Sequence, residues 1–238
     1  MFPYDAALAA ATKVPPRSIP EVLATMQTIA GICADGDGLK WFNWIYLQVT
    51  QQVENRVSQG GFNDPAWLST LDIQFAALYF NALNGYLAGG QCPGCWSAMF
   101  AVRNQNDIAR IQFALAGMNA HINHDLPSAI IATCKSTNTS PQHGSPQYTD
   151  YTSLNAAMDA LIQQARQTLN VRLLGDNLPA VTHIENTIAA WDLAAARESA
   201  WDTAQNLWQE APLIADAHLA IIDGLTTVIS KALLVPAP

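Results

Sequence analysis

The sequence contains few charged residues, and it contains no basic cluster. Only 13% of its 238 residues are Asp, Glu, Lys or Arg, whereas half are hydrophobic. This balance excludes a disordered chain, because disorder goes with low hydrophobicity and high charge. The formal net charge is −8, and the 11 Lys and Arg residues are scattered. No basic face is therefore available to neutralise phosphates, and we expect neither nucleic acid nor an anionic membrane surface as a partner.

A secretory signal and a continuous membrane span are also missing. The first residues lack a basic segment before their apolar stretch, which a secretory signal would have. The longest apolar run, 213–235, is interrupted by Asp216, His218, Asp223 and Lys231. We therefore predict a buried amphipathic helix there and no membrane span, and we expect a cytoplasmic protein.

Several motifs of known chemistry are absent as well. The chain has no G-x-S-x-G nucleophile elbow, no glycine-rich phosphate loop and no C-x-x-C-H haem motif. We therefore expect no nucleotide cofactor. Of the four cysteines, Cys92 and Cys95 have the C-x-x-C spacing of zinc and redox sites, but a second pair and a βαβ context are both missing. We interpret them as structural thiols in a Pro-Gly turn.

What the sequence does contain is helical periodicity along almost its whole length. Ser18 and Glu21 have the spacing of a capping box, and Asp64-Pro65 is typical of a helix start. Pro127 is expected to kink or end the helix that contains it. From such signals we predict helices at about 20–34, 39–59, 65–89, 96–103, 107–124, 150–174, 180–209 and 213–234.

These helices predict an all-α fold, a bundle of about seven to nine helices in one domain spanning 1–238. The segments 18–135 and 150–235 could form two sub-layers of that domain. Between them, 136–149 is rich in Ser, Thr, Pro and Gly and is predicted to be a long loop. A loop of this length either covers a pocket or links the two layers.

The strongest candidate site lies in the segment GMNAHINHDLP, residues 117–127. His121, His124 and Asp125 are three and four residues apart, so a helix would place them on one face. Two imidazoles and a carboxylate could hold a divalent metal such as zinc, iron or manganese, with an open position for water. Alternatively, Asp125 orients His121 as a metal-free general acid or base. A third interpretation is a structural cluster at a helix end.

A metal site would need a further ligand from another helix. Asp72 is the best candidate, because it interrupts an apolar helix face where an unpaired carboxylate would be costly. Glu54 is the second, and His183 with Glu185 is the third. For each of these residues the alternative is an ordinary cap, salt bridge or solvated side chain.

Arg197 is the remaining candidate for a catalytic role. It could neutralise a substrate carboxylate or lie near Asp125. It is also four residues before Trp201, so the two side chains could stack as a cation–π pair that only joins helices.

Three segments of the chain, LDIQFAALYFNAL, GMNAHINHDLP and ARESAW, resemble the bacterial family of unknown function numbered 5995. They span about residues 70–205, which is most of the chain. The positions that recur in this family correspond to Asn119, His121, Asn123, Asp125 and Leu126, whereas that of His124 varies. The resemblance therefore favours a site formed by His121, Asp125 and Asp72 over a metal site with two histidines. It implies no reaction, cofactor or fold.

From these residues we expect an enzyme that acts on a small, largely apolar molecule in a pocket between helices. His121, Asp125, Asp72 and Arg197 are the predicted catalytic residues, and His121, His124, Asp125 and Asp72 are the predicted metal ligands. Metal-activated water would allow hydrolysis, whereas a metal-free cyclase or isomerase would need only a shaped pocket and proton-handling groups. The rival is a helical module that binds an apolar ligand without catalysis. The oligomeric state stays open between a monomer and a homodimer.

Overall fold

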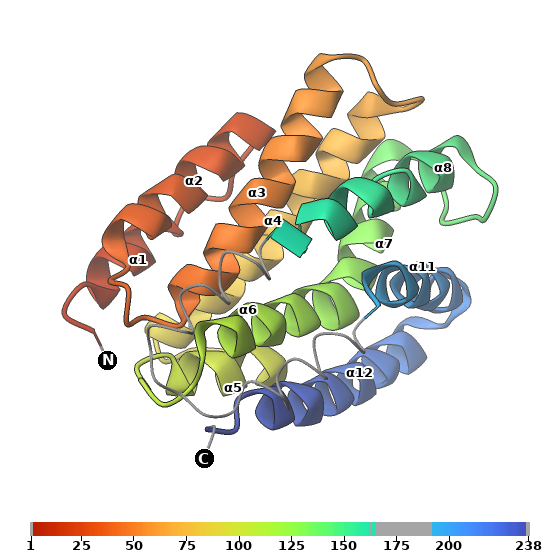
Figure 1. Ribbon diagram of the computed structural model, residues 1–238. Coiled ribbons are helices and arrows are strands. Elements are labelled where there is room, and N and C mark those ends of the chain that lie inside the picture. The colour runs from red at the N-terminus through yellow and green to blue at the C-terminus, as the bar shows by residue number, and fades with distance from the viewer. Residues whose placement is uncertain (1, 162, 165–191, 237–238) are drawn as a thin grey trace.

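The computed structural model describes residues 2–161, 163–164 and 192–236, and every regular element in these ranges is a helix (Figure 1). The predicted all-α fold is confirmed. In chain order the helices are α1 (Asp5–Ala11), α2 (Ile19–Ile32), α3 (Leu39–Ser58), α4 (Pro65–Leu87), α5 (Gly94–Val102), α6 (Arg110–Asn119), the π-helix η1 (Ala120–Asp125), α7 (Leu126–Thr137), α8 (Pro146–Thr152), α11 (Leu193–Gln209) and α12 (Pro212–Leu233). Residues 155–161 are helical too.

The central feature of the fold is the continuous run α6–η1–α7, which passes through the middle of the helices (Figure 1). On one side of this run α3 packs on α6 and α2 packs on α3, and on the other side α12 packs on α6 and α5. The π-helix η1 contacts α4, α5, α11 and α12. The buried apolar side chains form one continuous core around this run.

The two helix starts predicted from capping residues are where the sequence places them. Ser18 Oγ accepts a hydrogen bond from the Glu21 backbone N–H at 3.3 Å, and Asp64 Oδ1 accepts one from the Trp67 N–H at 3.0 Å. Such side-chain acceptors satisfy donors that a helix start leaves free. The capping box is not reciprocal, because the Glu21 carboxylate binds the backbone N–H of Arg17.

Pro127 does not end the helical run, which continues past it. Instead, the chain changes to a π-helix over Ala120–Asp125, and the Leu126 N–H donates to the carbonyl of His121, five residues back. Pro127 has no N–H, and its ring would collide with the carbonyl four residues earlier in a regular α-helix. The wider π turn therefore lies where the proline requires a local change, and α7 then continues to Thr137.

The long loop predicted at 136–149 is shorter in the structure. The helix α7 ends at Thr137, and Asn138 follows it in the left-handed conformation with φ of 55°. The helix α8 begins at Pro146, after the cap residue Ser145. The predicted helices at 150–174 and 180–209 lie partly outside the described residues.

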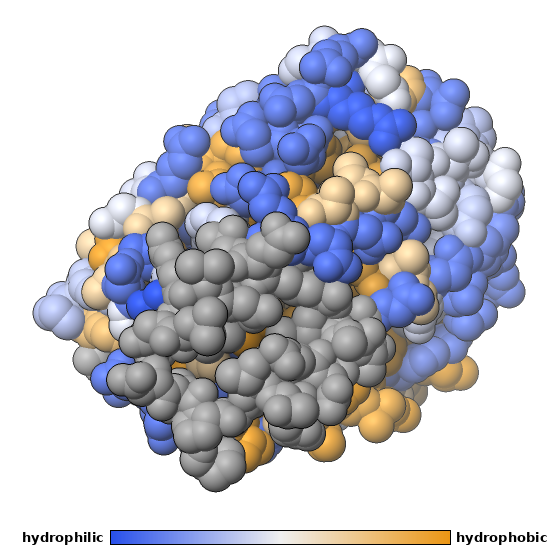
Figure 2. Space-filling view, viewed as in Figure 1, coloured by the Kyte–Doolittle hydropathy of each residue, from blue (hydrophilic) through white to orange (hydrophobic). Residues whose placement is uncertain are grey.

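The helix α12 corrects another expectation, because it is amphipathic but not buried. Its buried residues are the small polar Thr226 and Ser230, whereas Ile221, Leu225 and Val228 are each more than 60% exposed. The apolar surface is visible along the lower edge of the molecule in Figure 2. Among the described helices, α12 alone is long and apolar enough to cross a membrane by length and composition.

Candidate functional site

Asp125 holds both predicted histidines through its two carboxylate oxygens. Its Oδ2 lies 2.9 Å from His121 Nδ1, and its Oδ1 lies 2.7 Å from His124 Nδ1. The indole N–H of Trp96, on α5, also donates to Oδ2 at 2.9 Å. His121 and Asp125 are 2% exposed, so these bonds are sheltered from water. The structure therefore brings the three predicted residues together around one buried carboxylate.

The ring of His121 is enclosed by five aromatic side chains, which we call the aromatic cage. Phe75 stacks on the imidazole with ring centres 3.4 Å apart, and Tyr46 lies edge-on at 4.5 Å. The complete cage consists of Phe42, Tyr46, Phe75, Tyr79 and Trp96. These rings come from α3, α4 and α5, so three helices fix the orientation of His121.

The electrostatics of this cluster determine which histidine nitrogen carries a proton. Burial in the cage lowers the pKa of His121, although the hydrogen bond to Asp125 opposes this change. Burial favours the neutral carboxylic acid, but the bonds from both histidines outweigh it and lower the pKa of Asp125. An ionised Asp125 accepts from the Nδ1–H of a neutral His121. The lone pair of His121 is therefore on Nε2.

Nε2 of His121 is buried, and it has no hydrogen-bond partner among the described residues. His121 lines an apolar cavity of about 50 Å³, which also borders on Tyr46, Phe75 and Met158. A second cavity of about 40 Å³ borders on the same three residues, and its wall contains Asp72. Because the two cavities share walls, we describe them together as the double cavity.

Asp72 and Tyr46 add two more buried polar atoms without partners. Asp72 Oδ2 and the Tyr46 hydroxyl form no hydrogen bond within the described structure. Burial, assisted by the charge of Glu54, raises the pKa of Asp72 to about 8, so its carboxyl is largely protonated at neutral pH. Burial and the charges of Asp72 and Asp125 raise the pKa of Tyr46 well above 10. Glu54 itself is half-buried and lines neither cavity.

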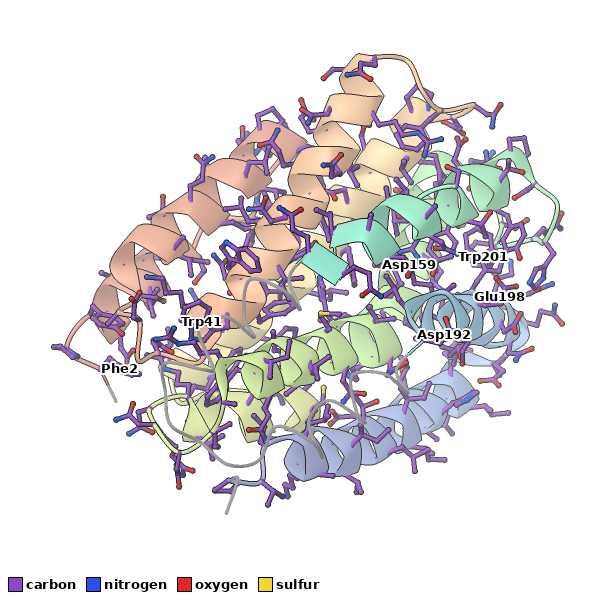
Figure 3. All side chains as sticks on the ribbon, viewed as in Figure 1. Phe2, Trp41, Asp159, Asp192, Glu198 and Trp201 are labelled. Carbon is purple, nitrogen blue, oxygen red and sulfur yellow. The ribbon has the colours of Figure 1, made fainter. Side chains whose placement is uncertain are left out.

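Arg197 lines both parts of the double cavity. The cation–π pair with Trp201, which was one of its predicted roles, does not form. The guanidinium carbon of Arg197 lies 4.0 Å from the centre of the Tyr151 ring. Trp201 and Glu198 project from α11 towards α8 (Figure 3), where Trp201 packs on Tyr148 and Tyr151.

The predicted metal ligands are not arranged around one point. Because Asp125 binds Nδ1 of both histidines, it lies between the two rings. Within the described part of the chain, two groups place ligand atoms within 4.8 Å of one another, and neither is the predicted set of His121, His124, Asp125 and Asp72. One group joins His124 to Cys95 and Asp223, and the other consists of His143, Glu198 and Asp202.

The group of Cys95, His124 and Asp223 lies at the start of α5. Asp223, from α12, accepts hydrogen bonds from the backbone N–H groups of Gly94 and Cys95 at 2.9 and 3.0 Å. These two bonds lower the pKa of Asp223, although burial opposes the change. Burial raises the pKa of the Cys95 thiol, and Asp125 and Asp223 raise it further. The expected Pro-Gly turn is wrong, because Pro93 caps α5 and Gly94 is already its first residue, and none of the four cysteines forms a disulfide.

Sequence reasoning did not identify Trp96, Tyr46 and Phe75 as parts of the site. Tyr46 and Phe75 lie on apolar helix faces, where an aromatic residue is normally core. Trp96 differs from other core residues only through its indole N–H, and a buried indole N–H requires an acceptor. His183 and Glu185, which were predicted as further ligands, lie outside the described residues.

The two asparagines of the segment 117–127 serve packing between helices. Asn119 and Asn123 bind each other, and Asn119 also binds Ser230 of α12.

No curated protein and no solved structure matches the chain. A family model does match, over residues 19–236, and it is that of DUF5995, a family of unknown function. The match includes every helix from α2 to α12, together with the aromatic cage and the double cavity. The chain therefore belongs to the DUF5995 family.

Proposed function

We propose that the protein is an enzyme that moves a proton on a small, largely apolar molecule bound in the double cavity, with His121 as the base. One observation carries this proposal: Nδ1 of His121 is held by Asp125, while Nε2 is buried, has no partner among the described side chains, and belongs to a residue that lines the cavity. A buried polar atom left unsatisfied is costly in a fold that needs it only for packing. It is useful in a base that must accept a proton from a ligand.

Asp125 would act as a positioning residue for this base. It fixes the tautomer that leaves Nε2 free, and it stabilises the imidazolium that forms when Nε2 takes a proton. The bonds from Trp96 and His124 keep Asp125 in place during this change.

Asp72 supplies a proton donor on the other side of the double cavity. A carboxyl with a pKa of about 8 can return a proton at neutral pH, and the hydroxyl of Tyr46 can donate a hydrogen bond between the two groups. One base and one neutral acid in an apolar cavity suit isomerisation, elimination or cyclisation. Each of these reactions removes a proton from one atom and delivers a proton to another.

The test uses 5-nitrobenzisoxazole, a small apolar molecule. A base removes the single C–H proton of its isoxazole ring, a nitrile forms as the N–O bond breaks, and a coloured phenolate is released. We expect the purified full chain to open this ring, and we expect His121→Gln to lower the rate by at least about tenfold. The pKa of His121 is lowered, so the rate should stay level as the pH falls towards 6.5 and should decrease only below it.

His218→Gln is the matched control, because His218 is a partly exposed histidine of α12 outside the cavity. It should react at the wild-type rate. Equal rates for the wild type and His121→Gln would contradict the proposal. If the probe binds but does not react, the protein is instead a binding module for apolar ligands.

A second candidate function is metal-assisted hydrolysis, and it is favoured by the group of Cys95, His124 and Asp223. His124 donates from Nδ1 to Asp125, which leaves its Nε2 for a cation. A thiolate, an imidazole and a carboxylate are ligands that suit zinc. Metal analysis of the purified chain distinguishes the candidates: stoichiometric zinc that is lost in Cys95→Ser and retained in His121→Gln would favour hydrolysis.

A further inference from the structure

Arg197 brings a positive charge into the core without a carboxylate partner in the part of the chain that the structure describes. The residue is 4% exposed, and it forms no ion pair with any described Asp or Glu. Its Nε donates to the side-chain oxygen of Asn155 at 2.8 Å, and its Nη2 donates to the backbone carbonyl of Tyr151 at 2.8 Å. Both acceptors are neutral, so they orient the guanidinium and leave its charge uncompensated.

Tyr151 and Asn155 together fix the orientation of the guanidinium, and we call these two residues the Arg197 clasp. Tyr151 contacts Arg197 in three ways. Its ring lies 4.0 Å from the guanidinium carbon, its backbone carbonyl accepts from Nη2, and its hydroxyl donates to the backbone carbonyl of Arg197 at 2.7 Å. Nη1 has no hydrogen-bond partner among the described residues. An arginine held in this way retains a donor group at the cavity wall, and a planar guanidinium fits a carboxylate well.

The walls of the double cavity contain no other cation among the described residues. The first part is lined by apolar and aromatic side chains apart from His121 and Arg197, and the second by apolar and aromatic side chains apart from Asp72 and Arg197. Asp72 shares a wall with Arg197 but forms no ion pair with it. Burial and Glu54 keep the Asp72 carboxyl protonated, so it does not neutralise the arginine either.

We propose that the double cavity binds an apolar molecule that carries a carboxylate, and that Arg197 pairs with this carboxylate. An isolated charge in an apolar interior is expensive, and a ligand anion compensates it in the bound state. The apolar walls then accommodate the rest of the ligand. This inference names the substrate class of the proposed enzyme and rests on the same cavity.

Calorimetric titration of the full chain with decanoate and with 1-decanol tests the proposal. The two probes share an apolar chain and differ in the charged head group. We expect decanoate to bind the wild type at least about tenfold more tightly, because a charge-assisted pair in a buried site is worth more than a neutral hydrogen bond. In Arg197→Met we expect the preference to disappear while 1-decanol still binds. Arg197→Lys keeps the charge but loses the planar guanidinium that donates two parallel hydrogen bonds, so its preference for decanoate should be intermediate.

Two controls separate the head group from other effects. Lys13→Met removes an exposed cation of equal charge outside the cavity and should keep the preference. Decyl phosphate distinguishes the carboxylate from another anion, and tighter binding of the phosphate would overturn the assignment. Equal binding of decanoate and 1-decanol by the wild type would overturn it as well, whether or not the Arg197 variants fold.

His121→Gln distinguishes this inference from the proposed function. It should lose the ring-opening activity and keep the preference for decanoate. A wild type that opens the benzisoxazole ring but shows no preference would disprove the carboxylate site alone. A preference without any His121-dependent reaction would disprove the acid–base function alone.

Discussion

Arg103 and Arg197 are both buried arginines, but their surroundings differ. Arg103 is 3% exposed and forms ion pairs with Asp5 and, at 3.5 Å, with Asp37. Arg197 is equally buried, and within the described ranges it binds only neutral oxygens of Tyr151 and Asn155. Arg103 also connects the helix α5, which it follows, to the start of the chain, whereas Arg197 faces the double cavity.

The difference separates a charge that belongs to the fold from one that is available to a ligand. In the first cluster, Asp37 accepts from the Leu39 N–H and the Tyr4 hydroxyl as well as pairing with Arg103. Its cation and carboxylates compensate each other before anything binds. In the second region, Arg197 and Asp72 share a cavity wall without pairing, and such unpaired polar groups occur preferentially at functional sites.

The largest expected effect comes from replacing each arginine by methionine. Arg103→Met leaves Asp37 and Asp5 without their cation and should lower the free energy of unfolding by about 3–5 kcal/mol. Arg197→Met removes an uncompensated charge and should cost about 1 kcal/mol or less. Urea unfolding at neutral pH measures both values. Equal losses for the two variants would show that Arg197 is as structural as Arg103.

The next effect is a pH dependence caused by Asp72. Its pKa is about 8 in the folded protein and 3.8 in an ordinary environment, so between these values the folded state keeps a proton that the unfolded chain releases. Its contribution to stability is present at low pH and decreases by about 1.4 kcal/mol for each pH unit on the way to neutrality. Relative to the wild type, the free energy of unfolding of Asp72→Asn should therefore rise by about 2–3 kcal/mol as the pH is raised from about 5 to about 7.

Unfolding of Asp72→Asn and the wild type at both pH values gives this difference directly. The exposed Asp159, labelled in Figure 3, provides the control variant Asp159→Asn, which should follow the wild type. A wild-type pH dependence that Asp72→Asn reproduces would mean that Asp72 is ionised and paired after all.

The smallest expected effect concerns the tyrosine hydroxyls beside the two arginines. Tyr151→Phe removes the bond to the Arg197 carbonyl and should cost about 1 kcal/mol in the free energy of unfolding. Tyr4→Phe removes a donor to the charged Asp37 and should cost about 1.5 kcal/mol. Thermal unfolding of both variants checks this. A loss above about 3 kcal/mol in Tyr151→Phe would make the Arg197 clasp a major element of stability.

Local interactions explain how much of the fold and site was predictable. Ser18 and Asp64 each accept a hydrogen bond from the backbone N–H three residues ahead, and His121 pairs with Asp125 four residues ahead. Such contacts depend on a few neighbouring residues, so spacing alone predicts them. The change of helix type before Pro127 was not predicted, because a proline can be accommodated in several ways and packing selects among them.

Contacts between distant segments account for what was missed. The stacking of Phe75 on His121 and the bond from Trp96 to Asp125 join separate helices, and nothing in the spacing of these residues indicates them. The exposure of α12 was missed for a related reason. Its apolar run predicts a helix with an apolar side, but the packing of α12 on α5 decides which side is covered.

The sequence by itself determined that this chain is helical, where its capped helices begin, and that a histidine and an aspartate meet on one turn. Only the tertiary structure decided that Nε2 of this histidine lies in an aromatic cage with no partner from the described helices, and that Asp72 and Arg197 line the adjoining cavity without pairing. The physical reason is range. Periodicity and caps act over a few residues, whereas burial, charge compensation and cavity walls depend on side chains that only the packing of distant helices brings together.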